Sequence, residues 1–230
     1  NITNYRCVLS LRDKEDKEKY YQDDEMWDKA ENELREVLNE LNIDYTEEIG
    51  EAAFYGPKLD VNVKPAVGNE YTLSTCQLDF CLPMKFDLKY VSKDGDKKTP
   101  VVLHRAILGS LDRFMAYILE ETKGALPLWL SPTQINVIPV NNEYHTEYAN
   151  KIYELLKDNG FRVNIDLRDE KLSYKMRESQ TKKIPYTLIL GDKEKENNNI
   201  SYRCFGNTDT KTIDTHEFIL LLKEQIRDKK

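Results

Sequence analysis

One short stretch of the chain combines groups that can bind a metal or an anion with a strand-like run and a glycine. In residues 99–114, TPVVLHRAILGSLDRF, an apolar run leads into His104 and Arg105, and Gly109 precedes a helical pattern that carries Arg113. Imidazole can bind a metal, and a planar guanidinium can stack on a purine or pair with a phosphate. Core packing favours neither group. The stretch therefore predicts a site for a planar, anionic ligand beside a buried strand.

These residues also have ordinary structural interpretations. Arg113 could pair with Asp112 or Glu120 on a helix surface, and His104 could be hydrogen-bonded in the core. The number of polar groups at the ends or on one face of predicted sheet elements favours a site, because concave sites are assembled in this way. The residues are Tyr55, Lys58, Thr75, Gln77, His104 and Arg113.

The composition is that of a soluble globular chain. The chain has 230 residues, a length that is enough for one large domain or two modest ones. It is 40% hydrophobic and 33% charged, with a net charge of −7. No apolar run approaches the roughly 18 residues of a membrane span, and the start does not resemble a signal peptide, so we expect a cytoplasmic protein. The four cysteines form no CxxC pair, and three histidines make a complete metal site from this chain alone improbable. Without an initiator Met, the sequence reads as a fragment of something longer.

The first half predicts an antiparallel sheet with few helices. A helix would begin at Asp23 or Asp24 and end near Leu41, since apolar residues recur there at three- and four-residue steps. A second helix would follow Ser110 and end near Glu121. The expected strands lie at residues 5–11, 43–45, 59–64, 71–80, 86–91 and 101–103. The last two would pair as a hairpin across the turn at residues 93–96.

The pattern changes at residues 124–132, GALPLWLSP, where two prolines interrupt the helical periodicity. We therefore expect one domain at residues 1–127 and another at 128–230. In the second, strands at 135–140, 162–166, 186–190 and 199–205 would alternate with helices at 143–159, 173–182 and 215–227, with a polar hairpin tip at 193–199. This order predicts a small α/β domain with a largely parallel or mixed sheet.

Residues 162–183 carry seven basic side chains against four acidic ones, in a chain that is acidic overall. Such a group can contact phosphates or bases, and an ordinary solvated helix face explains the same charges equally well.

Several strings in this order resemble those of bacterial threonyl-tRNA synthetases, a family of class II aminoacyl-tRNA synthetases. The strings are YGPK at 55–58, TCQLDF at 75–80, PVVLHRAILGS at 100–110 with Arg113, WLSP at 129–132, DLRDEKLSYKMRE at 166–178 and KIPYTLILGDKE at 183–194. The resemblance covers essentially the whole chain. It implies the antiparallel sheet portion of a class II catalytic domain, followed by a small α/β anticodon-binding domain with a mixed sheet.

The resemblance also implies an activity and its site residues. The family uses ATP with Mg²⁺ to activate threonine as threonyl-adenylate and transfers it to tRNA(Thr), as a cytoplasmic homodimer without membrane or DNA partners. Residues 99–114 would be motif 3, with Arg113 stacked on the ATP adenine and Lys58, Thr72 and Thr75 near the ATP. Tyr55, Gln77 and His104 would form the threonine pocket, where His104 is one of three protein ligands of a zinc ion.

In the second domain the resemblance implies a set of anticodon-binding residues. They are Asp169, Lys171, Arg177, Lys183, Glu194 and Arg203. The chain departs from the family pattern at Thr72, where many relatives have Gln, at Asp169, often Asn, and at Lys183, often Arg.

Motifs 1 and 2, the other two zinc ligands and the editing domain should precede residue 1. We therefore expect the parent enzyme to be a threonine–tRNA ligase and this fragment to be inactive alone. The alternative is a stand-alone tRNA-binding or regulatory paralogue without catalysis.

Overall fold

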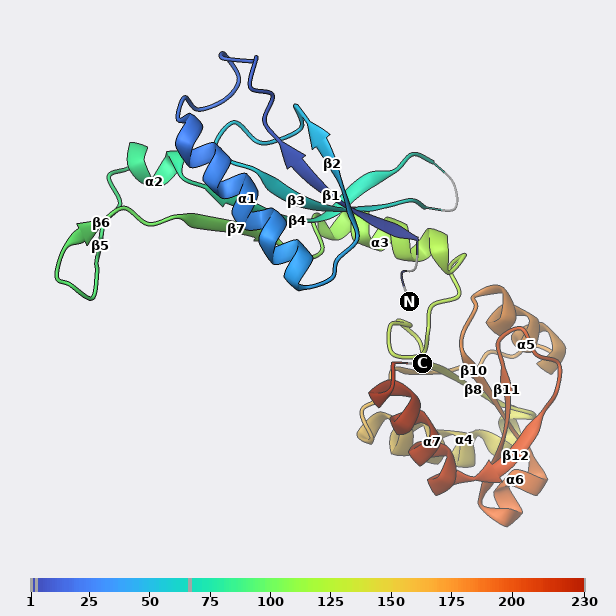
Figure 1. Cartoon of the computed structure of the whole chain (residues 1–230). Coiled ribbons are helices and arrows are strands. Elements are labelled where there is room, and N and C mark those ends of the chain that lie inside the picture. The colour runs from blue at the N-terminus through green and yellow to red at the C-terminus, as the bar shows by residue number, and fades with distance from the viewer. Residues whose placement is uncertain (1, 3, 66–67, 230) are drawn as a thin grey trace. The chain divides into compact units, whose positions relative to one another are not determined.

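The chain folds into two compact units, Asn1–Glu121 and Thr122–Lys230 (Figure 1). The computed structural model describes residues 2, 4–65 and 68–229. Each unit has its own five-stranded sheet. In the described part of the chain, no helix is long and apolar enough to cross a membrane.

The first unit is built on a sheet with the strand order β2-β1-β3-β4-β7. The strands are β1 (Tyr5–Leu11), β2 (Tyr45–Ile49), β3 (Lys58–Val63), β4 (Tyr71–Asp79) and β7 (Val102–Ala106). Neighbours are antiparallel except β1 and β2, which are parallel because helix α1 (Asp24–Glu40) forms the crossover between them. The expectation of a purely antiparallel sheet is wrong at this pair, and the strand expected at residues 43–45 begins only at Tyr45.

Helix α1 covers one face of this sheet. The Asp23 carboxylate accepts the backbone N–H of Met26 at 3.0 Å, which confirms the N-cap expected from the sequence. Leu34 and Leu38 of the helix pack against Leu9, Leu11 and Leu59 of the strands. The apolar stripe of α1 therefore seals one side, and the opposite side of the same strands is left to polar residues.

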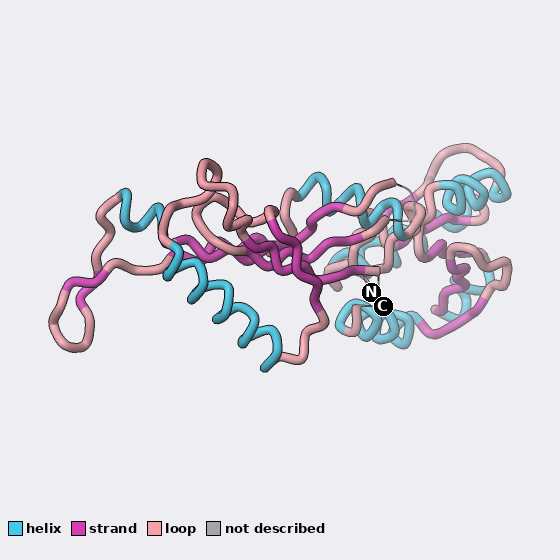
Figure 2. Tube along the Cα trace, turned by 45° about the horizontal axis from the view of Figure 1, so that its top comes forward, coloured by secondary structure: helices cyan, strands magenta, loops and turns pink. Residues whose placement is uncertain are grey.

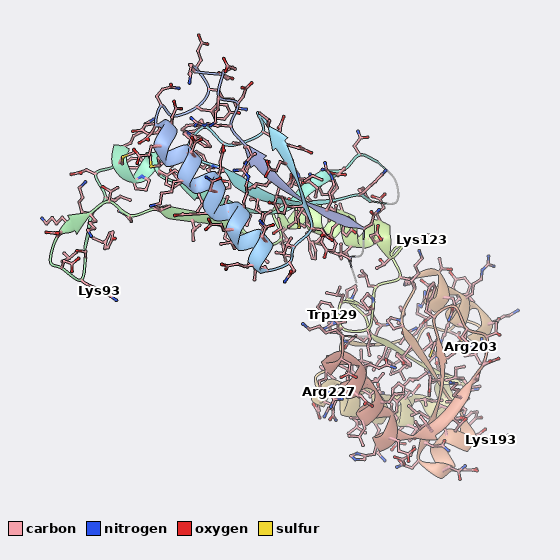
Figure 3. The ribbon with its side chains drawn as sticks, viewed as in Figure 1. Lys93, Lys123, Trp129, Lys193, Arg203 and Arg227 are labelled. Carbon is pink, nitrogen blue, oxygen red and sulfur yellow. The ribbon has the colours of Figure 1, made fainter. Side chains whose placement is uncertain are left out.

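The hairpin in residues 86–103 differs from the expected one. Strands β5 (Tyr90–Val91) and β6 (Lys97–Lys98) pair only with each other, after a short helix α2 (Cys81–Lys85) that the sequence analysis missed. They form an arm that projects from the sheet, with Lys93 near its tip (Figures 1–3). Strand β7 pairs instead with β4.

Strand β7 lies at the edge of the sheet, which corrects the expectation of a buried apolar strand at residues 101–103. Val101 is 53% exposed and Leu103 is 63% exposed. Apolar composition suggested a core strand, but with β4 on one side β7 has no described strand on its other side. Arg105 fastens this edge by donating to the Ser74 hydroxyl at 2.6 Å and to the Thr75 carbonyl at 2.9 Å.

Helix α3 (Leu111–Glu121) follows residues 99–110 and ends at Glu121, as expected from the sequence. Tyr117 on its inner side packs on Val63 and Leu73. Gly109, just before the helix, has φ +61° and lies so close to the Leu73 carbonyl that a Cβ would stand 2.6 Å from its oxygen. Only glycine fits this approach without displacing backbone.

The second unit has a mixed sheet with the order β12-β11-β10-β8-β9, as the sequence predicted for fold class. The strands are β8 (Ile135–Pro139), β9 (Val163–Ile165), β10 (Tyr186–Leu190), β11 (Asn199–Cys204) and β12 (Lys211–Asp214). β8 is parallel to both β9 and β10, whereas β11 is antiparallel to its neighbours. The polar hairpin tip expected at residues 193–199 is wrong: helix α6 (Asp192–Asn197) lies there, and β12 was not expected.

Helices cover both faces of this sheet. Tyr148 and Ile152 of α4 (Asn142–Asp158) and Phe218 of α7 (Thr215–Arg227) join Ile135 and Val137 in one apolar core. Asn136 points to the opposite face, where its amide nitrogen donates to Ser179 of α5 (Leu172–Thr181) at 2.5 Å. The face under α5 is therefore polar, and the face under α4 and α7 is apolar.

An ion-pair network holds the loop before α5 against that helix. The Arg168 guanidinium donates to both carboxylate oxygens of Asp166, at 2.9 and 2.6 Å, and also pairs with Glu178. Asp166 is almost fully buried. Its hydrogen bonds with Arg168 hold the pKa of the Asp166 carboxyl below its usual value, against the opposing effect of burial.

Gly109→Ala should destabilise the first unit by about 2–4 kcal/mol, because it adds a backbone clash to the cost of a left-handed conformation. Gly95→Ala is the matched control: Gly95 also has positive φ, but a Cβ there meets nothing within 4 Å, so we expect a loss of about 1 kcal/mol. Urea unfolding followed by Trp27 fluorescence in a Trp129→Phe background measures both. Equal losses would contradict the close-approach argument.

The network at Asp166 should make the stability of the second unit depend on pH at the acid end. Because the folded-state pKa of Asp166 is depressed, its contribution is present above the unfolded pKa of about 3.9 and is lost as pH falls through the folded pKa. Arg168→Gln should therefore lower the free energy of unfolding near neutral pH and make little difference at the acid end. Urea titrations followed by the β10 amide NMR signals test this. A deficit that is independent of pH would refute it.

Candidate functional site

The strand register of the first unit gathers polar residues on the face opposite α1. Lys58 of β3, Gln77 of β4 and His104 of β7 are direct cross-strand partners in one row. Asp60 and Thr75 form the next row. Partners in register share a face of the sheet, so Lys58 and His104, which are 46 residues apart in sequence, lie on either side of Gln77.

Tyr55, in the turn before β3, completes the first row. Its hydroxyl donates to Gln77 Oε1 at 2.5 Å, and its ring lies 5.5 Å from the His104 ring, centroid to centroid. Burial, and secondarily the charge of Asp79, raises the pKa of the Tyr55 hydroxyl. The phenol therefore stays protonated at neutral pH and acts as a hydrogen-bond donor. Tyr55, Gln77 and His104, expected together from the sequence, do meet.

Asp79 orients His104 and was not among the residues singled out from the sequence. It is fully buried, and its Oδ2 lies 2.8 Å from His104 Nε2 while its Oδ1 accepts the backbone N–H of Leu82 at 2.9 Å. A carboxylate that holds one imidazole nitrogen leaves the other available, which is the usual environment of a metal-binding histidine. The sequence does carry a signal for Asp79. It lies two residues after Gln77 and four after Thr75 on one strand, a spacing that places all three side chains on the same face of the sheet.

The donor set for a metal is incomplete in the described residues. His104 suits the role of one ligand, but no group of three or more His, Cys, Asp or Glu side chains that could hold a metal is found among residues 2, 4–65 and 68–229. A complete zinc site would take its remaining ligands from outside this set.

Lys58 of the first row and Thr75 of the second have polar groups that internal contacts do not fully use. Lys58 pairs with the buried carboxylate of Asp60, which also accepts from the Ser10 hydroxyl at 3.4 Å. The Thr75 hydroxyl is buried, and the described residues offer it no hydrogen-bond partner. An orphan hydroxyl beside a lysine suits a polar ligand.

Two of the expected ATP-site residues lie outside this cluster. Thr72 is exposed beyond an irregularity in the β3–β4 register and donates to Asn62 Oδ1 at 2.8 Å. Arg113 is exposed on α3, where its charge lowers the pKa of Tyr71 against the larger effect of burial, which raises it. In the described part of the chain, no hydrogen bond joins either residue to Tyr55, Gln77 or His104.

In the second unit, Arg177 and Arg203 line one groove. The groove, of about 440 Å³, lies between α5 and strands β10 and β11, and Met176 and Ile189 supply apolar walls. Arg203 donates to Thr210 Oγ1 at 3.1 Å, and its Nε is buried without a partner among the described residues. Figure 3 marks Arg203 on β11. Two guanidinium groups over an apolar surface can stack on bases and pair with phosphates.

The other expected anticodon residues lie before α5, after it and on α6, and none of them is among the described residues that line the groove. Asp169 and Lys171 are exposed in the segment that leads into α5. Glu194 accepts from Ser201 Oγ at 2.6 Å and from the Gly191 N–H at 2.9 Å, so it joins α6 to β11. Lys183 adopts φ +55° and donates to the Lys123 carbonyl. Glu194 and Lys183 therefore also have structural contacts, which the sequence did not reveal.

The two units match two family models. The model described as "tRNA synthetase class II core domain (G, H, P, S and T)" matches residues 12–122, and the one described as "Anticodon binding domain" matches residues 134–225. Together they account for most of both sheets.

The curated relatives include threonine–tRNA ligases of Staphylococcus carnosus (strain TM300) and Staphylococcus saprophyticus. The first is 55% identical over 227 residues, which are 99% of this chain and 35% of the relative. The second is 55% identical over 230 residues, 100% of this chain and 36% of the relative. The chain thus spans about a third of the length of these relatives.

Solved structures of aminoacyl-tRNA synthetases are also similar to this chain. The RNA binding domain of threonyl-tRNA synthetase from Cryptosporidium parvum Iowa II superposes with a TM-score of 0.87 at 34% identity, over 96% of this chain and 55% of that one. Prolyl-tRNA synthetase from Cryptosporidium parvum shares the fold at a TM-score of 0.59 and 18% identity, over 76% of this chain and 39% of that one. Over its whole length the chain is therefore similar to threonyl-tRNA synthetases, with a segment that matches the class II core followed by one that matches an anticodon-binding domain.

Proposed function

We propose that the protein of which this chain forms about a third is a threonine–tRNA ligase. It would use ATP with Mg²⁺ to convert threonine into threonyl-adenylate and then transfer the acyl group to tRNA(Thr). The observation that carries the proposal is the row formed by Tyr55, Gln77 and His104, in which three polar groups from separate segments converge on one face of the core sheet. The identity of 55% to threonine–tRNA ligases supports it.

In this proposal the row binds the amino acid. Tyr55 donates and Gln77 offers its amide group, while Asp79 fixes the orientation of His104. His104 would hold a zinc ion together with two further protein ligands. Bound zinc would coordinate the amino and hydroxyl groups of threonine, which a valine methyl cannot imitate. The protein's own part is to keep the imidazole aligned and the phenol protonated.

The ATP would bind beside this row. Lys58 would exchange some of its contact with Asp60 for a phosphate oxygen, and the Thr75 hydroxyl would gain the partner that it lacks. Arg113 would stack on the adenine after turning from its exposed position, and Thr72 would lie at the margin of the nucleotide. The segment at residues 1–127 would thus serve catalysis.

Residues 128–230 would read the anticodon. Arg177 and Arg203 would contact bases in the groove along α5, and Asp169, Lys171, Lys183 and Glu194 would contact the loop around it. Unpaired anticodon bases suit this combination, because they expose both their π-faces and their hydrogen-bonding edges. The full protein would act as a cytoplasmic homodimer without membrane or DNA partners, as the resemblance to the threonyl-tRNA synthetase family implies.

The 230-residue chain alone should give no threonine-dependent ATP–pyrophosphate exchange. Its described residues supply His104 but no complete metal site, and the chain spans only about a third of the length of the threonine–tRNA ligases that it matches. The assay compares the purified chain with the full-length protein from the same gene. Turnover by the isolated chain comparable to that of the full protein would show that these residues suffice.

The same chain should bind a tRNA(Thr) transcript and lose about tenfold or more in affinity when the anticodon is exchanged, since each discriminated base is worth on the order of 1–3 kcal/mol. Arg177→Ala and Arg203→Ala should weaken binding, whereas Lys93→Ala, on the β5–β6 arm of the first unit, also removes one positive charge and should not. Filter binding at constant salt measures this. Equal affinity for both transcripts would sink the anticodon assignment.

A further inference from the structure

A second cavity lies under α5, on the side away from the groove of Arg177 and Arg203. It has a volume of about 420 Å³ and is bounded by β8 and β9, the loop after β9, and the helix itself. Cavities that hold small ligands typically measure about 300–1,000 Å³. Nothing in the anticodon-binding role described above uses it.

The topology of the sheet favours a ligand at this place. After the adjacent parallel strands β8 and β9, the chain enters α4 on one face and α5 on the other. Where neighbouring connections leave a parallel sheet on opposite faces, a crevice opens at the carboxyl ends of the strands, and ligands of α/β proteins bind there. The cavity is lined at this place by the residues directly after β9, which are Asp166, Leu167 and Arg168.

The floor of the cavity is made of amide side chains. Asn136 and Asn164 are partners in register on β8 and β9, and Asn164 Nδ2 donates to Asn136 Oδ1 at 2.7 Å. Asn136 Nδ2 in turn donates to Ser179 Oγ at 2.5 Å. This arrangement leaves the carbonyl oxygen of Asn164, an exposed residue, at the lining of the cavity. The face of a sheet that lies under a helix is normally apolar. Polar side chains at this floor therefore lower the free energy of unfolding relative to an apolar contact.

Lys175 supplies a buried cation in the wall. The residue is 2% exposed, and its ammonium group donates to the Asp166 carbonyl at 3.1 Å and to Asn142 Oδ1 at 3.5 Å. Both of these acceptors are neutral, and an ammonium group has three N–H donors. A buried cation is stabilised by an anion. The Asp166 carboxylate attracts Lys175 electrostatically, but the two groups that accept hydrogen bonds from the ammonium group are uncharged.

The charges at the rim favour an anion as well. Arg168, Lys175 and Lys182 line the cavity together with the carboxylates of Asp166 and Glu178. Both carboxylates are already paired, Asp166 with Arg168 and Glu178 with Arg168 and Lys182. Three cations against two anions leave one positive charge for a ligand.

We propose that this cavity binds a free nucleoside monophosphate, a ligand distinct from the anticodon. The phosphate would lie near Lys175 and Lys182, and the amide of Asn164 would hydrogen-bond the edge of the base. Planar donor and acceptor edges match carboxamides, and the phosphate supplies the charge that the wall lacks. The site is separated from the groove of Arg177 by α5 itself.

The test is an NMR titration of the ¹⁵N-labelled chain with AMP, GMP, CMP and UMP, and with inorganic phosphate and the parent nucleosides as comparisons. At least one nucleotide should shift the amide signals of Asn136, Asn164 and Ser179, and should bind at least about tenfold more tightly than phosphate or its nucleoside. Equal binding of phosphate, or shifts confined to residues around Arg203, would overturn the proposal.

Variants make the test specific. Asn164→Ala, at an exposed side chain, and Lys182→Ala, at the rim, should each weaken nucleotide binding about three- to tenfold. Lys175→Met, which keeps the side-chain volume, should abolish it, with the amide spectrum checking that the unit is folded. Lys193→Ala on α6 (Figure 3) removes one equivalent charge elsewhere and should bind as the parent does. If Asn164→Ala and Lys182→Ala both bind as tightly as Lys193→Ala, the cavity is not the site.

Discussion

The register of β3, β4 and β7 is the constraint on which the rest of the first unit depends. Because side chains alternate along a strand, a fixed register gives one face of these strands to the leucines under α1 and the other to Lys58, Gln77 and His104. A slip of one residue would bury the lysine and expose the leucines. The apolar contact with α1 therefore determines where the polar groups of the opposite face stand.

In the second unit, by contrast, helices cover both the apolar and the polar face of the sheet. Its sheet is sealed on one face by α4 and α7, while α5 crosses the other face on a polar surface. A helix that packs on a polar surface needs specific polar contacts to hold it in place. Arg168 provides them through its ion pairs with Asp166 and Glu178. Because α5 is narrower than the sheet, it leaves a groove on each side, one apolar with two arginines and one polar with Lys175.

Sequence reasoning recovered what depends on local pattern. The helix capped by Asp23 and the alternating strands β3 and β4 follow from periodicity, and the mixed sheet follows from the order of elements. It failed where a partner distant in sequence decides: composition could not show that Leu103 lies on an edge strand, or that β1 pairs in parallel with β2. Of the candidate site, the sequence singled out Tyr55, Gln77 and His104, which the structure brings together and whose role stays a prediction. Asp79 was missed because its role exists only through its contact with His104.

The close approach of Gly109 to Leu73 connects these levels. The β3–β4 register shifts between Val61 and Asn62, and β4 crosses this irregularity at Leu73, whose carbonyl stands against Gly109. The contact fixes where α3 begins, and Tyr117 on α3 then packs back on Leu73. The irregularity that separates Thr72 from the Gln77 row is therefore the same feature that places the helix carrying Arg113. A side chain at position 109 would therefore disturb both the irregularity beside Thr72 and the start of the helix that carries Arg113.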